Sequence, residues 1–449
     1  MNAPTRHTFG SRLGLVLATA GSAVGLGNIW RFPYELGSNG GAVFLLVYVV
    51  CIVLLGLPTM LCEMVLGRRA QANATRAYGR GPWRYVGYLA VLTAFLIMGF
   101  YAVVAGWTLQ YTYASLVGQL QGDPEYIGRY FETFTHDAFI PVAWTAGFVL
   151  LTHLTIVGGV QKGIERMSKW LMPLLFLLLV VLVGCSLALP GSKVGLDFLF
   201  RPDWSKLSAR TVFDALGQTF FSLSIAMGCL ITYASYFSRK VRLDRVAVQT
   251  AGIDTMVAVM AGLIIFPAAF SVGIKPDAGP SLIFITLPNV FEQAFALVPW
   301  LGNVVGALFY VLLAVAALTS LISLHEAPTA FVKEEFGISR RAAARWVSVL
   351  TIVSGTLCSL SLGPVDALSV GGRSLFDFLD YLTADYLLII GGLLMVIYVG
   401  WVMPKESLRE EMTNFGAHRF RAFGWFRFCV RFICPIGIVL VFLHQLGII

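Results

Sequence analysis

Long stretches with almost no charged residue run through this chain and decide what it can fold into. Of its 449 residues, 57% are hydrophobic and 12% are charged, whereas a soluble domain carries about 25% charged residues. A helix needs about 20 apolar residues to cross a bilayer, and it satisfies its own backbone there. We therefore expect an all-α integral membrane protein, and we exclude a soluble enzyme, a disordered chain and a fibrous protein.

Eleven stretches are long and apolar enough to be membrane-spanning helices, and they make residues 1–449 a single domain. We expect one more short amphipathic helix, at 281–294, that does not span the membrane. The expected spans lie near 12–37, 41–66, 86–116, 140–158, 168–189, 211–236, 246–272, 298–331, 346–363, 375–401 and 423–446.

The distribution of Lys and Arg predicts which way the spans point. With the N-terminus in the cytoplasm, 24 of the 32 Lys and Arg residues lie in cytoplasmic segments and 8 lie outside, in keeping with the positive-inside rule. An odd number of spans then places the C-terminus outside. We expect a multi-pass protein of the cell (inner) membrane, and the net charge of +8 follows from this topology rather than from a nucleic-acid-binding arm.

The reactive side chains do not form a catalytic set. The seven Cys residues all fall within apolar runs, and no CxxC or Cys/His metal spacing occurs. The six His residues form no HExxH-like motif, and the neighbours His325 and Glu326 lie on different helix faces. The chain is therefore not expected to be an enzyme.

Two of the expected spans contain sequences that interrupt a helix. Residues 19–28 read TAGSAVGLGN and residues 217–228 read GQTFFSLSIAMG. Each Gly costs about 1 kcal/mol in a helix interior relative to Ala. Interrupted helices at corresponding positions of two halves are typical of transporter binding sites, because the freed carbonyls and amides must line a cavity. The alternative is a glycine-rich face on which two helices pack.

Several long motifs together resemble one family. The stretch AGSAVGLGNIWRFPY at 20–34, followed by NGG at 39–41, is similar to the first-span signature of the neurotransmitter:sodium symporter family. The resemblance covers nearly the whole chain. Its other motifs are GLPTMLCEMVLGR (56–68), FYAVVAGWTL (100–109), KGIERMSKWLMP (162–173), GQTFFSLSIAMG with TYASY (217–236), AALTSLIS (316–323) and SLFDFLDY (374–381).

The resemblance implies a fold and an activity. The family's LeuT-type fold has two inverted five-helix repeats with discontinuous helices 1 and 6. Here the repeats would be residues 10–190 and 211–403, followed by an appended span at 423–447. The chain resembles the short, eleven-span bacterial members, so we expect Na⁺-coupled symport of a neutral α-amino acid by alternating access. Membrane lipid would surround it, and no obligate protein partner is implied.

The resemblance also implies two sodium sites built from hard oxygen ligands, which suit a small cation. The ligands of the first site would be the Ala23 carbonyl and the side chains of Asn28, Ser222 and Asp254. The ligands of the second would be the carbonyls of Gly21, Val24 and Ala316 and the hydroxyls of Thr319 and Ser320. Taken alone, the hydroxyl pair has an alternative role, which is to bond back to its own helix.

The substrate's charged ends would meet the interrupted helices. In the family pattern, the carboxylate meets the backbone amides of Leu26 and Gly27 and the Tyr101 hydroxyl. The ammonium group meets the carbonyls of Ala23, Phe221 and Ser222 and the Ser224 hydroxyl. Relatives that carry monoamines have an aspartate where this chain has Gly25, so Gly25 favours a substrate with its own carboxylate.

The resemblance implies a side-chain pocket with no charged residue, which disfavours a charged substrate. Met227 is flexible and suits large apolar shapes, so we expect aromatic or branched aliphatic amino acids. Ala226 stands where the family has glycine, which would narrow the pocket or stiffen the break. The pocket residues would be Ile97, Tyr101, Phe221, Met227, Ser320, Ser323 and Leu324.

Two charge pairs would form the gates. Arg31 and Asp380 lie at the outer ends of spans 1 and 10, and the family pattern pairs them as the external gate. Arg6 and Glu334 would be the internal counterpart, although they can also be solvated cytoplasmic charges. Glu63, in span 2, is expected to be a hydrogen-bonding hub rather than a ligand.

Asp254 lies in the middle of a span, where a charge costs about 2.5–3.5 kcal/mol on insertion scales. The resemblance places it at the asparagine of the first sodium site. Animal members bind chloride nearby, around the positions of Tyr48, Gln218, Ser222 and Ala258. A fixed carboxylate at Asp254 would supply that negative charge, so we expect no chloride requirement. The alternative is a protonated, structural aspartate.

Two other functions fit part of the pattern. An amino-acid-gated channel or receptor would share the binding site but would not accumulate its ligand. A symporter for small neutral amino acids would share the mechanism and differ in pocket size.

Overall fold

The computed structural model describes residues 8–273, 282–363 and 365–448, and most of them are helical. Several long helices contain a π-helical turn, so that one span carries more than one label. The α-helices are α1 (Arg12–Ala23), α2 (Phe32–Ser38), α3 (Ala42–Cys51), α4 (Leu57–Ala70), α5 (Ala74–Ala77), α6 (Arg84–Leu116), α7 (Pro124–Thr135), α8 (Ile140–Val157), α9 (Arg166–Leu187), α10 (Ser192–Phe200), α11 (Ala209–Ser222), α12 (Cys229–Ala234), α13 (Leu243–Ser271), α14 (Leu287–Ala294), α15 (Pro299–Glu335), α16 (Arg340–Leu360), α17 (Leu375–Leu382), α18 (Leu388–Ile397), α19 (Lys405–Met412), α20 (Phe423–Phe428) and α21 (Cys434–Gln445).

The remaining elements are short. Two two-residue strands form a small antiparallel ladder outside the helical body. The π-helical turns are η1 (Gly27–Arg31), η2 (Ile52–Gly56), η3 (Val160–Glu165), η5 (Leu282–Thr286), η7 (Thr383–Leu387), η8 (Tyr398–Val402) and η9 (Cys429–Ile433); the 3₁₀ turns are η4 (Trp204–Lys206) and η6 (Asp366–Leu368); the strands are β1 (Ser369–Val370) and β2 (Arg373–Ser374).

Within the described residues, nine helices are long and apolar enough to cross a membrane. A tenth span is formed by α1 together with η1 and α2, which meet at a bend of 55°. The stretch expected at 211–236 is divided between α11 and α12 by the break at 223–228. Counting these two as one interrupted span gives the predicted eleven, and that count and the inverted repeats remain predictions.

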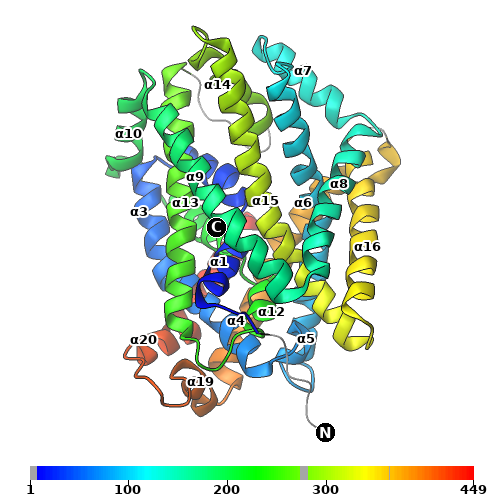
Figure 1. Ribbon diagram of the computed structural model, residues 1–449. Helices are drawn as coiled ribbons and strands as arrows, with labels where there is room; N and C mark the ends of the chain where they lie inside the picture. The colour runs from blue at the N-terminus through cyan, green and yellow to red at the C-terminus, as the bar shows by residue number, and fades with distance from the viewer. Residues whose placement is uncertain (1–7, 274–281, 364, 449) are drawn as a thin grey trace.

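Different short helices lie at the two ends of the bundle, as Figure 1 shows. The start of the chain lies at the same end as α5 and α19, and α7, α10 and α14 lie at the other end. The short helix expected at 281–294 is present from residue 282 onward as η5 and α14, and residue 281 lies outside the described residues. The sequence did not predict α7 or α10.

Both interrupted helices lie against the same central scaffold. Helix α1 packs against α9, α13 and α15, and α12 packs against α4 and α15. Helix α15 also packs along α6, which makes these two long helices the core of the bundle. The breaks are therefore held by continuous helices on several sides.

The break between α11 and α12 has a strained backbone held by one carboxylate. Ser224 and Ala226 have φ values of 51° and 69°, in the left-handed region that costs a non-Gly residue about 1–2 kcal/mol. The Ala226 and Ile231 amides donate to the Glu63 carboxylate at 2.5 and 3.3 Å. Glu63 is fully buried on α4, so its geometry is that of the expected hydrogen-bonding hub.

Two ion pairs with a buried carboxylate connect separate helices. The Glu326 carboxylate accepts both Arg340 guanidinium nitrogens, at 2.8 and 2.6 Å, and the Tyr236 hydroxyl at 2.6 Å. Arg68 donates to the Glu411 carboxylate at 2.7 Å and also to the Glu411 backbone carbonyl. A buried charge needs such a partner, because removing one member typically costs about 3–5 kcal/mol.

The role of Glu63 predicts a stability loss. In Glu63→Ala, the Ala226 and Ile231 amides lose their acceptor, and each orphaned buried donor costs about 1–3 kcal/mol. We expect the melting temperature of the detergent-purified protein to fall by several degrees. Glu406→Ala, on the exposed face of α19, is the control. Equal melting temperatures for both variants would contradict the hub.

Candidate functional site

A cavity lies where the two interrupted helices face each other. It is lined from the α1–η1 break, the α11–α12 break, α6 and α15, and every residue expected to bind substrate is part of its wall. Those residues are Ala23, Gly25, Leu26, Gly27, Ile97, Tyr101, Phe221, Ser222, Ser224, Met227, Ser320, Ser323 and Leu324.

The break after α1 leaves backbone amides without a partner in the helix. Side-chain oxygens around this cavity accept hydrogen bonds from them. The Leu26 amide donates to the Tyr101 phenol oxygen at 3.2 Å, and the Gly25 amide donates to Asn28 Oδ1 at 2.9 Å. The Ser224 hydroxyl, from the other break, donates to the Ser22 carbonyl at 2.9 Å. The two breaks are thus joined by a direct hydrogen bond, and the Leu26 amide and Tyr101 hydroxyl meet at one point.

Glycine is required at two positions of this wall. A Cβ at Gly25 would lie 3.0 Å from the Tyr101 hydroxyl oxygen and closer still to the Ser320 hydroxyl oxygen. A Cβ at Gly27 would lie 2.7 and 2.9 Å from two Phe221 ring carbons. Both contacts are closer than real Cβ atoms make, so any side chain at either position would displace the opposite wall.

Three of the four residues expected at the first sodium site, Asn28, Ser222 and Asp254, come together in a buried cluster, and the fourth, Ala23, lines the cavity. The Asn28 Nδ2 donates to Asp254 Oδ1 at 2.7 Å and to the Ser222 hydroxyl at 3.1 Å. The Ser222 hydroxyl donates to Asp254 Oδ2 at 2.8 Å, and the Tyr48 hydroxyl approaches the same oxygen at 3.4 Å. Asn28 and Asp254 are fully buried, and the carboxylate's side-chain partners within the described residues are all neutral.

This cluster has the chemistry of a Na⁺ site, with one difference from the expectation. It offers carboxylate, hydroxyl and carbonyl oxygens, and the nearby Gln218 Oε1 is buried without a hydrogen-bond partner among the described residues. However, Asn28 turns its amide nitrogen toward Asp254, because its oxygen accepts from Gly25. For the Asn28 oxygen to act as a ligand here, it would accept the Gly25 amide and bind the cation with its second lone pair.

The residues expected at the second sodium site also lie together. The Ser320 and Thr319 hydroxyls approach the Val24 carbonyl oxygen at 2.9 and 3.4 Å, and Thr319 also donates to the Ala316 carbonyl at 2.9 Å. A Cβ at Gly21 would lie 3.2 Å from the Thr319 Cβ. These oxygens come from α1 and α15, so a cation there would join the interrupted helix to the scaffold.

A larger vestibule of about 520 Å³ adjoins the cavity and shares Tyr101, Phe221 and Asp380 with it. Arg31 and Asp380, the expected outer gate, both line this vestibule. Within the described residues, however, the ion pair of Arg31 is with Glu35, at 3.6 Å, and its guanidinium lies 4.7 Å from the centre of the Phe221 ring. The expected pairing of Arg31 with Asp380 is therefore not formed in this structure.

At the other end, Glu334 lies in a network that the sequence only partly indicated. Its carboxylate accepts the Asn73 amide at 2.8 Å, and Arg76 donates to its backbone carbonyl at 2.7 Å. The neighbouring Glu335 accepts from Arg76 and Arg84, at 2.7 and 2.5 Å. Arg6, the expected partner of Glu334, lies outside the described residues.

Several wall residues were not predicted from the sequence. Half of them come from η7 and the start of α18, which carry no glycine interruption that would signal a site, and the other half come from α1, α6 and α12. Asp380, expected as a gate, also reaches the cavity wall, so the pocket has one charged residue at its edge. The wall residues that were missed are Ser22, Phe100, Cys229, Thr383, Ala384 and Leu388.

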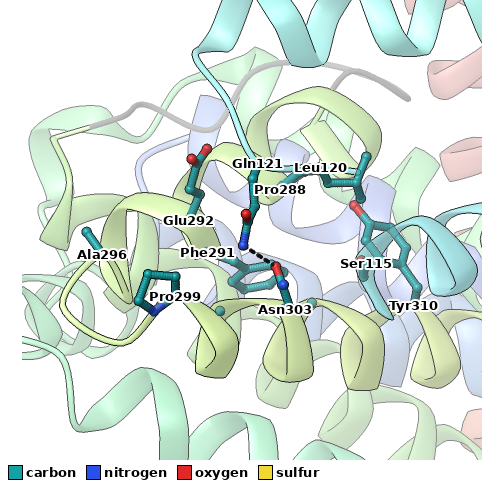
Figure 2. Close-up of a pocket in the computed structure, with 12 residues that line it drawn as sticks. Ser115, Leu120, Gln121, Pro288, Phe291, Glu292, Ala296, Pro299, Asn303 and Tyr310 are labelled. Carbon is teal, nitrogen blue, oxygen red and sulfur yellow. Dashed lines mark hydrogen bonds between the residues drawn. The ribbon is translucent and has the colours of Figure 1, made fainter. Parts of the chain in front are cut away.

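A separate cavity of about 230 Å³ lies between α14, the start of α15 and the segment after α6, as Figure 2 shows. Gln121 donates to Asn303 across it at 3.0 Å, and Glu292 accepts the Gly122 amide at 2.9 Å. None of the residues expected to bind substrate or sodium lines this cavity, and none of its lining residues belongs to the interrupted helices.

A central, buried, oxygen-rich site between two interrupted helices is typical of secondary transporters. The particular class follows from comparison with known proteins. The model of the sodium:neurotransmitter symporter family matches residues 6–124 and 136–448. The chain belongs to this family.

Individual relatives agree with that assignment. An uncharacterized sodium-dependent transporter, YhdH, of Bacillus subtilis (strain 168) is 38% identical, over 98% of this chain and 97% of the relative. The sodium-dependent dopamine transporter of Bos taurus is 26% identical, over 98% of this chain and 69% of the relative. The crystal structure of MhsT in complex with L-phenylalanine is similar, with a TM-score of 0.87, 42% identity and coverage of 98% and 100% of the two chains.

The tight contacts at Gly25 predict an effect that needs no ligand. A methyl group in Gly25→Ala must displace the Ser320 and Tyr101 hydroxyls, and such overpacking costs about 1–3 kcal/mol. We expect a lower melting temperature in detergent. The control is Gly184→Ala on α9, where an added Cβ meets nothing within 4 Å. A Gly25→Ala variant as stable as this control would show that the wall is looser than described.

Proposed function

We propose that this protein imports a neutral, large hydrophobic or aromatic α-amino acid together with Na⁺, by alternating access and without chloride. The observation that carries the proposal is the cavity between the two interrupted helices, with an oxygen cluster on either side of it. The phenylalanine bound to the similar MhsT supports an amino acid as substrate. We further propose eleven spans in two inverted repeats, with a cytoplasmic N-terminus in the inner membrane.

The identity of the wall residues supports this substrate class. Gly25 leaves no acid to replace a missing substrate carboxylate, and the Leu26 amide and Tyr101 hydroxyl meet where that carboxylate would bind. The far wall is formed by Ile97, Met227 and similar apolar residues. The cavity has a volume of about 40 Å³, so a large side chain requires the flexible Met227 to move.

Two sodium ions provide the driving force in this proposal. If two Na⁺ accompany one zwitterion, two charges cross the membrane in each cycle. Each charge is worth about 2.3 kcal/mol per 100 mV, or about 4.6 kcal/mol for the pair. At about 1.4 kcal/mol per decade, voltage alone supports roughly 10³-fold accumulation. An amino-acid-gated channel has the same site but gives no accumulation.

Sodium coupling is tested at the second cluster. Thr319→Ala removes one hydroxyl ligand, so proteoliposome uptake should need several-fold more Na⁺, while the ranking of substrates stays the same. Thr255→Ala is the matched control, because that hydroxyl donates only to Ala251 of its own helix. Wild-type uptake that ignores both the Na⁺ gradient and the voltage would rule out the symport proposal.

Substrate selectivity is tested by competition against one radiolabelled ligand. We expect tryptophan, tyrosine, phenylalanine and leucine to compete better than alanine and glycine. Each methylene left unburied loses about 0.8 kcal/mol. The affinity for glycine should therefore be roughly two orders of magnitude lower than the affinity for leucine. If glycine or a charged amino acid competed best, the proposed pocket would be wrong.

Asp254 is the residue to test for chloride independence. Replacing chloride by gluconate should leave wild-type uptake unchanged, because the carboxylate supplies the negative charge beside the first cation. Asp254→Asn removes that charge, so uptake should be lost or should become chloride-dependent. Adding Ala258→Glu, one helical turn away, should restore uptake without chloride.

The control for this series is Asp244→Asn on the same helix, where the carboxylate pairs with Arg242 instead. It should keep chloride-free uptake. A wild-type protein that needs chloride, or an Asp254→Asn variant that behaves like wild type in both media, would exclude the proposed role of Asp254.

A further inference from the structure

A cavity of about 410 Å³ lies beside the segment that precedes α1. Its walls come from the segment before α1, the beginning of α1, the turn between α12 and α13, and the first turn of α13. Neither the substrate residues nor the two oxygen clusters contribute to it.

The charged side chains on its walls are all basic. They are Arg12, Lys240, Arg242 and Arg245. Arg242 pairs with Asp244 at 2.5 Å. Within the described residues, the other three make no ion pair, so the cavity keeps an excess of three positive charges. Such a concave, like-charged wall attracts an anion more strongly than scattered surface charges do.

Two acidic side chains from neighbouring elements bond to residues of the wall, and both already have a basic partner. Glu326, on α15, accepts the Tyr236 hydroxyl and pairs with Arg340. Glu165, on η3, accepts the Gly10 amide at 2.6 Å, the Ser11 hydroxyl at 2.7 Å and the Lys169 ammonium at 2.7 Å. It holds the segment before α1 in place rather than neutralising the basic residues. Arg12, Lys240 and Arg245 are exposed on the wall, so an anion from the surroundings can reach all three.

The surroundings of the cavity indicate where that anion comes from. Leu13 directly follows Arg12, and Val248 lies one turn after Arg245 on the same face of α13. Their exposed fractions are 64% and 59%, which is typical of residues that face lipid. A phosphate held by Arg12 and Arg245 would place apolar chains attached to it beside Leu13 and Val248.

We propose that this cavity binds the phosphate headgroup of an anionic membrane lipid. The proposal depends on the cytoplasmic position of the N-terminus, and not on the substrate or on the sodium sites. Guanidinium groups suit phosphate because they donate two parallel hydrogen bonds. Basic pockets between helices on the cytoplasmic side are the usual form of such sites.

The bound headgroup would join two parts of the fold. One wall is the segment before α1, where the Phe9 amide donates to the Tyr236 carbonyl at 3.3 Å. The other wall is the start of α13. A phosphate bridging Arg12 and Arg245 holds that segment against the bundle, so anionic lipid should raise the thermal stability of the protein.

The test uses the full-length protein in detergent micelles. Phosphatidylglycerol or cardiolipin is titrated in, with phosphatidylcholine as the zwitterionic comparison and glycerol phosphate as the soluble phosphate. Bound lipid is counted by native mass spectrometry, and the melting temperature is followed in parallel. We expect both anionic lipids, but neither phosphatidylcholine nor glycerol phosphate, to bind and to raise the melting temperature.

The triple variant R12Q/K240Q/R245Q removes the unpaired charges. Each basic residue near an anionic headgroup is worth about a factor of five, so the affinity should fall on the order of 100-fold. The matched control K333Q/R341Q/R345Q removes three exposed charges elsewhere on the expected cytoplasmic side and should keep the affinity. Melting in phosphatidylcholine shows that both variants are folded.

Three results would overturn the proposal. One is an equal loss of lipid binding in the two triple variants, which would mean a general charge effect. Another is unchanged binding in R12Q/K240Q/R245Q. The third is stabilisation by glycerol phosphate without stabilisation by lipid, which would make this a site for a soluble phosphate. Wild-type Na⁺ dependence of uptake is measured separately, so failure here leaves the transport proposal standing.

Discussion

The structure depends on how two unwound stretches of backbone are satisfied inside an apolar bundle. Lipid offers no hydrogen bonds, so each freed amide or carbonyl needs a partner from the protein. At the first break, Leu26 donates to Tyr101, and Val24 accepts from Ser320. At the second, the Glu63 carboxylate accepts hydrogen bonds from the backbone amides of two residues. The continuous helices α4, α6 and α15 supply these partners, which is why the breaks lie between them.

The same constraint explains why the site can exchange ligands. Tyr101, Asn28 and Ser320 bond to the backbone in this structure, and they are also the residues that the proposed function assigns to substrate and sodium. A ligand that bonds to these side chains replaces their hydrogen bonds to the backbone. Its net binding energy therefore stays moderate, while the geometry of the break changes. Differential contacts of this kind are what bias a protein between two conformations.

The sequence located the breaks because helix propensity is local. Glycine-rich stretches at 19–28 and 217–228 predicted the interruptions, and α1 ends at Ala23 while α11 ends at Ser222. The family motifs then predicted individual residues of the cavity wall. Long-range partners were less accessible: Arg31 pairs with Glu35 rather than Asp380 here, and Glu335 pairs with Arg76 and Arg84. Side-chain pairing depends on rotamers and on neighbours from distant segments, which no local pattern encodes.

Helix ends show the same division between local and long-range information. The ninth span was expected from residue 346, whereas α16 begins at Arg340. A hydropathy average ends a predicted span at a charged residue, because the scale assumes that every charge is solvated. Arg340 is instead half of a bidentate pair with the buried Glu326. The Ser339 hydroxyl also accepts the Ala342 amide and caps the helix, so the helix extends through residues that a hydropathy count assigns to the loop. The count of basic residues on that side of the membrane is unaffected, since α16 starts where the expected loop lay. The predicted orientation depends on the side on which each charge lies and not on whether that charge is paired, so the longer helix leaves that prediction unchanged.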